Sequence, residues 1–505
     1  MQLLQTCWFN NPKKLDAGWL STQYHLMSWG LSALSYSKFY PNIELITDAV
    51  GQELLIDKLG LPYHSVSMAQ EYYKPEFESL WVLRKLYSYA IQSAPFIHAD
   101  GDTYLFKPFD DEILNAPLVG QNMEYDHPCY VSGYQEVGLK CRYIPAYVKK
   151  DANNTLSAVN AGIMGGNDYA FYQYFFEEVN DFVSQNRNHV EDLDNFTFNI
   201  FLEQFIFKKL ADKSNLRIAY QVKEPIGYPY VYNLFDFWNL PNQNSYIHVM
   251  NYKQNPTICE QVAQRLYIES PALYERVVKV ANELEATKVS RYVVDEKTSN
   301  FYRTALIAKA LGITFSEDEV LAGLTENHEN KVLKDAFQYE TEKLEFIKGL
   351  PSMEVYSAYR KQQSLSVNTV LSKPIEKVLN TSITFGKHVS LIESEWMWAE
   401  KNEFTGQDKT VDYLLNLQQE AAYFQVVLFG YPVSASIKEQ LSDTITILII
   451  DALQQVENNQ LLMQEIVDNV ANEIYALNQS RSIEELSATV LDKIRYLLYQ
   501  GVLSV

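Results

Sequence analysis

Short apolar runs alternate with segments of helical periodicity over the first half of the chain. Apolar runs at Leu3–Phe9, Ile43–Thr47 and Phe96–Ala99 predict strands, and each run is followed by polar or turn-forming residues. Between these runs, apolar residues recur at helical spacing in Gly18–Ser37 and Leu80–Gln92. This alternation predicts a mostly parallel sheet with helices on both faces, in which ligands bind beyond the carboxyl ends of the strands.

The pattern is less regular further along the N-terminal half. Residues 128–160 are predicted to form irregular strands and loops. Helical spacing returns at Asp168–Ser184 and Asn195–Leu210, and Tyr246–Val249 predicts a last short strand.

After about residue 285 glycine becomes scarce and helical spacing dominates. Helices are predicted at Phe301–Leu311, Asn330–Ile347, Lys409–Phe429, Ile437–Val456, Gln460–Leu477 and Ser482–Tyr499. We therefore expect an α/β domain over residues 1–284 and a separate all-helical domain over residues 285–505.

Composition limits the classes of function. The net charge of −21 argues against nucleic-acid binding, which needs a basic surface. The four cysteines form no Cys-x-x-Cys pair, so a structural zinc site is not expected, and their sparseness suits a reducing cytoplasm. The N-terminus has no signal-peptide pattern, and no apolar run reaches the ~18 residues of a membrane span. We expect a cytoplasmic protein without a membrane span.

The strongest chemical feature is Asp100-Gly101-Asp102, which directly follows the predicted strand Phe96–Ala99. Side chains two residues apart in an extended segment face the same side, and two adjacent carboxylates repel unless a cation lies between them. Mg²⁺ and Mn²⁺ prefer oxygen ligands and leave coordination places for phosphate oxygens. The alternative is a simple polar turn, because Asp and Gly are also common turn residues.

Four further features have both a functional and a structural interpretation. His248 could be a ligand for a transition metal and Lys253 a partner for a diphosphate, although on these residues alone a core histidine beside a surface lysine is the favoured explanation. Asn160-Ala161-Gly162 would allow close approach of a ligand to the backbone, or form a turn. Glu203-Gln204 faces either a cleft or solvent from an apolar helix, and Arg84-Lys85 meets either a phosphate or solvent.

Taken in their order along the chain, these five features resemble those of GT-A glycosyltransferases. The resemblance covers roughly residues 1–280. The resemblance is greatest to the glycogenin-like retaining family and to transferases with a DxD sugar-binding motif. It extends to an uncharacterised bacterial group that carries Pro-Phe-x-His-x-Asp-Gly-Asp, which Pro95–Asp102 matches. The chain departs from the glycogenin-like closing motif, because His248–Lys253 lacks its glycine and is not followed by Pro-Trp.

The resemblance implies a GT-A fold and a role for each matched residue. A Mn²⁺ or Mg²⁺ ion would be held by Asp100, Asp102 and His248, and the donor would be a nucleoside-diphosphate-sugar such as a UDP- or GDP-sugar. The residues implied in donor binding are Asp48 at the nucleoside, Lys85 and Lys253 at the diphosphate, and Asn160, Ala161 and Gly162 at the sugar.

The same resemblance places Glu203 and Gln204 near the reacting carbon of the sugar. An inverting enzyme needs a carboxylate base, for which Glu203, Asp194 and Asp192 are candidates, whereas the resemblance favours retention, which needs no such base. The acceptor would be a glycan, peptide or protein. The helical domain would bind the acceptor or a partner protein, or mediate self-association.

Two alternatives stay open at this point. One is a non-catalytic scaffold or nucleotide-sugar-binding protein on the same fold. The other is a metal-dependent nucleotidyltransferase or phosphohydrolase. Retention of both carboxylates of the Asp-Gly-Asp motif argues against the scaffold.

Overall fold

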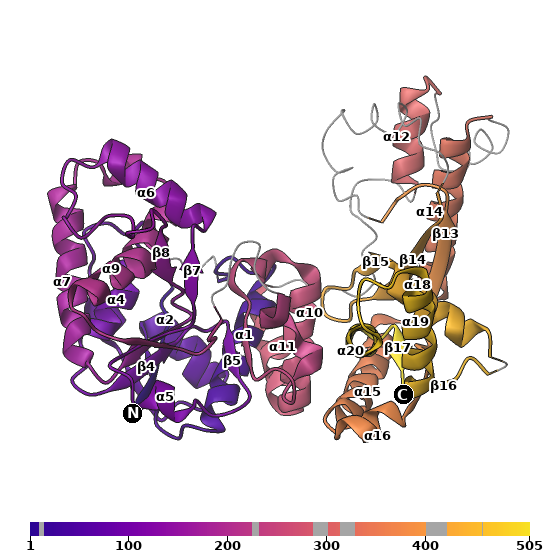
Figure 1. Ribbon diagram of the computed structural model, residues 1–505, viewed down its shortest axis with the longest axis horizontal. Coiled ribbons are helices and arrows are strands. Elements are labelled where there is room, and N and C mark those ends of the chain that lie inside the picture. Colours follow the sequence, from indigo (N-terminus) through magenta and orange to yellow (C-terminus); the bar gives the residue numbers. More distant parts are fainter. Residues whose placement is uncertain (10–14, 225–231, 286–300, 314–328, 400–421, 457) are drawn as a thin grey trace. The chain divides into compact units, whose positions relative to one another are not determined.

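The computed structural model describes residues 1–9, 15–224, 232–285, 301–313, 329–399, 422–456 and 458–505. The chain divides into two compact units, Met1–Ala286 and Thr287–Val505 (Figure 1). Among the described helices, none is long and apolar enough to cross a membrane.

A seven-stranded sheet in the order β10-β6-β9-β4-β1-β2-β3 forms the centre of the first unit. Its strands are β1 (Gln2–Thr6), β2 (Ile43–Ile46), β3 (Ser65–Ser67), β4 (Phe96–Ala99), β6 (Leu118–Gly120), β9 (Ile163–Gly166) and β10 (Ile218–Tyr220). Neighbouring strands are parallel except where β9 pairs with β4 and β6. The predicted mostly parallel sheet is therefore confirmed.

Two short antiparallel pairs accompany this sheet. One consists of β5 (Thr103–Leu105) and β11 (Tyr246–His248), and the other of β7 (Met123–Tyr125) and β8 (Ser157–Val159). The longer helices are α1 (Thr22–Ser37), α4 (Val82–Ala90), α6 (Pro128–Lys140), α7 (Tyr169–Gln185), α8 (Asn195–Ile200), α9 (Ile206–Lys213), α10 (Pro256–Glu269) and α11 (Pro271–Glu285). The shorter ones are α2 (Ala49–Gly51), α3 (Ala69–Tyr72), α5 (Asp111–Leu114) and the 3₁₀ or π turns η1 (Gln52–Lys58), η2 (Val190–Asp192), η3 (Phe201–Phe205), η4 (Tyr232–Phe235), η5 (Phe237–Asn239) and η6 (Met250–Gln254).

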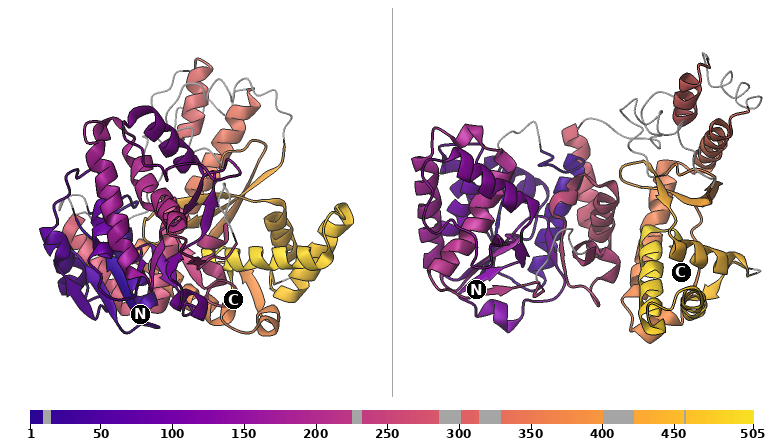
Figure 2. Two further views of the ribbon diagram at one scale, coloured as in Figure 1. Left: turned by 60° about the vertical axis from the view of Figure 1, so that its left-hand side comes forward. Right: turned by 45° about the horizontal axis from the view of Figure 1, so that its top comes forward.

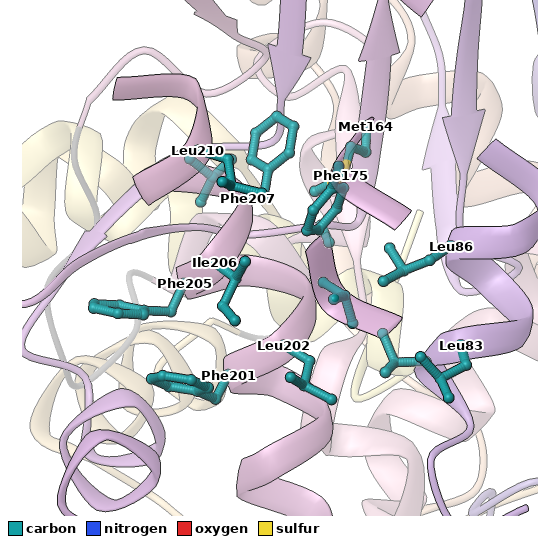
Figure 3. Packing of buried hydrophobic residues seen from close by; sticks show 14 of the residues in the cluster. Leu83, Leu86, Met164, Phe175, Phe201, Leu202, Phe205, Ile206, Phe207 and Leu210 are labelled. Atoms are coloured by element: carbon teal, nitrogen blue, oxygen red, sulfur yellow. The ribbon is translucent and has the colours of Figure 1, made fainter. Parts of the chain in front are cut away.

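Successive strand residues point to opposite sides of the sheet, and both sides are buried. Leu4 and Phe96 pack with α4, α7 and α9 in one core cluster, whereas Leu3 and Ile97 pack with Tyr36 of α1 in another. Helices α10 and α11 lie beside α1 (Figures 1 and 2). Figure 3 shows part of the first cluster, with Leu83 and Leu86 of α4 on one side and Phe201 and Phe205 of η3 on the other.

One local prediction in this unit is wrong. Residues 128–140 form helix α6 rather than an irregular segment. His127 caps this helix by accepting from the Cys129 amide, and Pro128 occupies its first turn. Only Tyr130, Gly133 and Val137 are buried, so the apolar stripe is too sparse to reveal the helix in the sequence.

The second unit contains helices and two small antiparallel sheets, so the predicted all-helical composition is wrong. The sheets have the orders β13-β14-β15 and β16-β12-β17. The helices are α12 (Tyr302–Ala310), α14 (Lys331–Gly349), α15 (Met353–Leu371), α16 (Ile375–Leu379), α18 (Thr444–Gln454), α19 (Met463–Leu477) and α20 (Ile483–Gln500). The strands are β12 (Ser382–Phe385), β13 (Val389–Ser394), β14 (Phe424–Gly430), β15 (Ile437–Leu441), β16 (Leu461–Leu462) and β17 (Leu503–Ser504).

The error has a physical origin in β14, which lies largely inside the predicted helix Lys409–Phe429. This strand packs against one core cluster through Val426 and Leu428 and against a second through Val427 and Phe429. A strand buried on both faces is an unbroken apolar run, which periodicity cannot distinguish from a helix. Most of the rest of that predicted helix, residues 409–421, lies outside the described residues.

Candidate metal centre and surrounding cleft

A cleft of about 640 Å³ opens where β1 and β4 of the first unit end. Its walls come from the segment after β1, helices α1 and α4, the amino end of α6, the α8–η3 segment and the residues after β11. Nine of the residues predicted for a site line it: Lys85, Asp100, Asp102, Asn160, Gly162, Glu203, Gln204, His248 and Lys253. The structure thus brings residues from five separate segments to the carboxyl edge of the sheet.

The Asp100-Gly101-Asp102 segment forms a tight connection between β4 and β5. The Asp100 amide donates to the Gly162 carbonyl at 3.0 Å, and the Thr103 hydroxyl donates to the Asp100 carbonyl at 2.8 Å. A Cβ atom on Gly101 would lie 2.6 Å from the ring of Trp29. Glycine is therefore required here by close packing, which a simple polar turn would not demand.

His248 reaches the same place because β11 pairs with β5. In this antiparallel pair His248 is opposite Thr103, and the Val249 amide donates to the Asp102 carbonyl at 3.1 Å. One ligand atom from each of Asp100, Asp102 and His248 lies within 4.8 Å of the others. Among the described residues, this is the one cluster of three or more such side chains.

A chain of hydrogen bonds sets the tautomer of His248. Asn122 donates its side-chain N–H to the Met123 carbonyl, so its Oδ1 is left to accept from Gln121 Nε2 at 3.0 Å. Gln121 Oε1 then accepts from the His248 ring at Nδ1, at 2.6 Å, and from Tyr246. The proton is therefore on Nδ1, and the Nε2 lone pair is available to a metal.

Burial lowers the pKa of His248 to about 4, so the ring is neutral at physiological pH. Its Nε2 atom is 3.7 Å from Asp102 Oδ1. Two carboxylates and a neutral imidazole form a donor set that suits Mn²⁺ and is compatible with Mg²⁺. The residues present thus fit a divalent cation, with its histidine held by Gln121 as metal-ligating histidines usually are.

Two lysines balance the carboxylates. Lys85 Nζ is 2.7 Å from Asp100 and 2.8 Å from Glu203, and it also donates to the Ala161 carbonyl at 3.2 Å. Lys253 Nζ is 3.0 Å from Asp102. The Lys85 side chain is 7% exposed and the Lys253 side chain 32%, so only Lys253 has room to turn toward a ligand.

The two carboxylates have opposite pKa shifts. Burial raises the pKa of Asp100 to about 7, despite the attraction of Lys85. Burial also acts to raise the pKa of Asp102, but Lys253 and His248 outweigh it and lower that pKa below its usual value. A bound cation would favour the ionised form of both groups.

Glu203 and Gln204 are presented to the cleft by a π-helical turn, η3. Phe201, Leu202 and Phe205 of the same turn lie in the core (Figure 3). Such turns are rare and are often found at functional sites. Gln204 Oε1 lies 2.6 Å from the hydroxyl of Tyr130, which belongs to α6.

Residues 1–280 match the model of a family described as being of unknown function, DUF6734. The chain belongs to the DUF6734 family. No curated protein matches it in sequence.

Three solved structures are similar to the DUF6734 chain at low identity. Mouse xyloside xylosyltransferase 1 in its apo form has 14% identity and a TM-score of 0.26, over 43% of this chain and 84% of that chain. Galactosyltransferase LgtC in complex with donor and acceptor sugar analogs has 12% identity and a TM-score of 0.25, over 57% of this chain and 98% of that chain. An active-site mutant of LgtC has 10% identity and a TM-score of 0.26, with the same coverage.

Three predicted site residues of this DUF6734 chain have their side chains outside the cleft lining. Asp48 caps α2 through the Gly51 amide and also accepts from the Phe9 amide at 2.7 Å, so it holds the segment after β1. Asp194 is the exposed N-cap of α8. Ala161 contributes its carbonyl to Lys85. Arg84, the alternative to Lys85, forms a pair with Glu78 instead.

Sequence reasoning missed several residues of the site. Gln121 follows strand β6 as the first polar residue after an apolar run, and this position was a usable signal. Trp29 and Tyr130 lie on helices, where an aromatic residue gives no local sign of facing a cleft. Glu124 lies in the short strand β7, whose three residues are too few to show a period.

Proposed function

We propose that residues 1–280 bind a nucleoside-diphosphate-sugar through a divalent cation and transfer its sugar to an acceptor. The observation that carries this proposal is the cluster of Asp100, Asp102 and His248 at the floor of a cleft at the carboxyl ends of the sheet. Two carboxylates and a histidine with its Nε2 lone pair exposed are a site for a cation. The adjacent Lys253 adds a positive charge beside it, as a diphosphate ligand requires.

Asp100, Asp102 and His248 would hold Mn²⁺ or Mg²⁺, which when bound supplies Lewis-acid stabilisation of a diphosphate leaving group. Lys253 is partly exposed, and its ammonium can leave Asp102 for a phosphate oxygen. Lys85 has a different task, because its donors are directed to Asp100, Glu203 and the Ala161 carbonyl. It offsets part of the negative charge of these two carboxylates and fixes their positions.

The charges around Glu203 favour a retaining reaction. An inverting enzyme needs a carboxylate that can take a proton from the acceptor. Glu203 is 1% exposed and paired with Lys85, and Asp194 lies outside the cleft lining. Neither side chain is placed to act as that base, whereas in retention the leaving phosphate can accept the proton.

Binding and hydrolysis measurements test the proposal. The full chain is titrated with Mn²⁺ or Mg²⁺ and a panel of UDP- and GDP-sugars, and release of the nucleoside diphosphate is followed. We expect nucleotide binding that requires the metal, slow donor hydrolysis, and loss of both in Asp100→Ala. Absence of metal-dependent nucleotide binding in the wild-type chain would exclude both the transferase and a metal-dependent nucleotidyltransferase or phosphohydrolase.

The stereochemistry has its own test. When an acceptor has been found, NMR of the product reports the configuration at the transferred sugar's anomeric carbon. Retention of the donor's configuration is expected. An inverted product would require a base that neither Glu203 nor Asp194 supplies in this arrangement.

A further inference from the structure

Glu124 is a buried carboxylate that the metal centre does not use. It lies in β7 and is 1% exposed. Within the described residues, the contacts of its two oxygens are with neutral donors. Asn160 Nδ2 donates to Oε1 at 3.0 Å, and the Tyr130 hydroxyl makes a short hydrogen bond to Oε2.

The orientation of Asn160 fixes one side of this network. Asn160 Oδ1 accepts from the backbone amide of Gly162 at 3.1 Å, and a backbone N–H can only donate. The other end of the Asn160 side chain is therefore the NH₂ group, which faces Glu124. Glu124 Oε1 therefore acts as an acceptor. Burial raises the pKa of Glu124, whereas hydrogen bonds from the side chains of Tyr130, Asn160 and Asn122 act to lower it. Three donors around one carboxyl group are the pattern of an ionised carboxylate, which only accepts.

Tyr130 connects Glu124 to Gln204. Its hydroxyl oxygen is in hydrogen-bond contact with Glu124 Oε2 and lies 2.6 Å from the end of the Gln204 amide that the structure assigns as Oε1. A phenol has one proton, and two acceptor oxygens cannot both receive it. A hydrogen bond to a carboxylate is roughly twice as strong as one to a neutral amide oxygen, so the proton belongs to the bond with Glu124.

The Tyr130 oxygen is then left to accept a hydrogen bond from Gln204. The two ends of a glutamine amide have nearly the same shape, so hydrogen bonding decides which end faces which neighbour. We propose that Glu124, acting through Tyr130, turns the Gln204 amide so that its NH₂ group meets Tyr130 and its carbonyl oxygen faces the cleft. Glu124 and Tyr130 are thus positioning residues for Gln204.

The consequence for the site rests on the proposed function. Gln204 follows Glu203 in the π-helical turn and lines the cleft beside it. Because Lys85 takes up the charge of Glu203, the Gln204 carbonyl is the neutral acceptor that this turn offers to a bound sugar. A hydroxyl group of the sugar would donate to it. With the opposite orientation, the turn would offer an NH₂ donor instead.

A ligand-free NMR measurement tests the orientation directly. The full chain is labelled with ¹⁵N-glutamine, and the side-chain NH₂ signal of Gln204 is assigned by its loss in Gln204→Leu. We expect one slowly exchanging NH₂ proton in the wild type, because it is donated to Tyr130, and fast exchange of both in Tyr130→Phe and Glu124→Gln. Fast exchange of both protons in the wild type overturns the proposal, as does an unchanged signal in Glu124→Gln.

Glu124→Gln is informative because it keeps the shape of the side chain. Its carbonyl would accept from Asn160, so its NH₂ group would face Tyr130 and force the phenol proton toward Gln204. Tyr134→Phe is the matched control, since Tyr134 lies on the same helix and contacts Phe205 through its ring. The NH₂ signal of Gln204 should be unaffected in this control, and all variants should keep the wild-type melting temperature within a few degrees.

Calorimetry provides the functional measurement and separates the two proposals. With Mn²⁺ present, Glu124→Gln and Tyr130→Phe should weaken binding of a nucleoside-diphosphate-sugar by about tenfold, the effect of one lost hydrogen bond. Binding of the nucleoside diphosphate alone should be unchanged. Equal affinities for the donor in all variants overturn the role at the sugar. If the wild type binds no nucleotide with metal, the proposed function fails, while the NMR result still decides the orientation.

Discussion

Gly162 is the position at which one added methyl group should disturb the candidate metal centre most directly. A Cβ atom there would lie 2.2 Å from Gln121 Oε1 and 2.5 Å from His248 Nδ1. These two atoms form the 2.6 Å hydrogen bond that sets the tautomer of His248. Since ordinary contacts begin near 3.4 Å, Gly162→Ala must displace the pair by about an ångström.

The displacement has two measurable effects. Overpacking of a buried site costs about 1–3 kcal/mol of unfolding free energy, or about 2–4 °C in melting temperature for each kcal/mol. Loss of the partner that orients a metal-ligating histidine typically costs about 10–100-fold in metal affinity. We therefore expect a modest fall in melting temperature, measured by differential scanning fluorimetry, and a large fall in Mn²⁺ affinity, measured by calorimetry.

Gly138→Ala is the matched control. Gly138 is exposed in helix α6, and nothing lies within 4 Å of the position of its Cβ atom. Alanine stabilises a helix interior by about 0.5–1 kcal/mol relative to glycine, so this variant should be as stable as the wild type or more so, with unchanged Mn²⁺ affinity. If Gly162→Ala bound Mn²⁺ as tightly as Gly138→Ala, His248 would not be a ligand in this geometry.

Three further predictions concern the same centre. Gln121→Leu should lower Mn²⁺ affinity by about tenfold, because the His248 ring loses its acceptor, and unchanged affinity would contradict the role of Gln121. The pKa of Asp100 is raised to about 7, so protons compete with the metal for this carboxylate at lower pH. Mn²⁺ affinity should therefore fall by about tenfold per pH unit below pH 7. An affinity that does not change with pH would contradict this. Lys253→Ala should strengthen binding of the metal alone, because it removes a competing ammonium from Asp102. The same variant should weaken binding of a nucleoside diphosphate. Calorimetry with each ligand distinguishes these effects.

The sequence is most informative where periodicity and length agree. Strand β4 and helix α7 agree with their predicted ranges within a few residues. Strand β4 is a buried run of four residues, too short for a helix and closed by Asp-Gly-Asp, and α7 buries residues at helical spacing. Strand β14 and helix α6 do not, for opposite reasons. The strand is apolar on both faces and resembles a buried helix, and the helix buries so few residues that it resembles a loop.

In the candidate site too, some residues could be identified from local features of the sequence and others could not. Asp100 and Asp102 could be singled out because their chemistry and their place after a strand are both local features of the chain. The pairing of β5 with β11, which brings His248 to them, is a contact between distant segments and has no local signal. Asp48 is predicted to face the nucleoside, but it caps helix α2. A carboxylate that follows a strand can serve either purpose, so the sequence alone does not distinguish them.

The two lysines offset part of the negative charge in the cleft. Taken alone, Asp100, Asp102 and Glu203 would place three carboxylates in or beside one buried pocket, and unpaired buried charges cost several kcal/mol each. Lys85 lies between two of them, Asp100 and Glu203, in a buried position, and Lys253 pairs with the third, Asp102, from a partly exposed position. Two positive charges thus face three carboxyl groups, and burial raises the pKa of Asp100 to about 7, so that this group can hold a proton near neutral pH. A cation held by both Asp100 and Asp102 would compete with Lys253 at Asp102 and with Lys85 at Asp100. If the cleft binds a nucleoside diphosphate as proposed, displacement of the partly exposed Lys253 from Asp102 by the cation would leave its ammonium free to pair with a phosphate group.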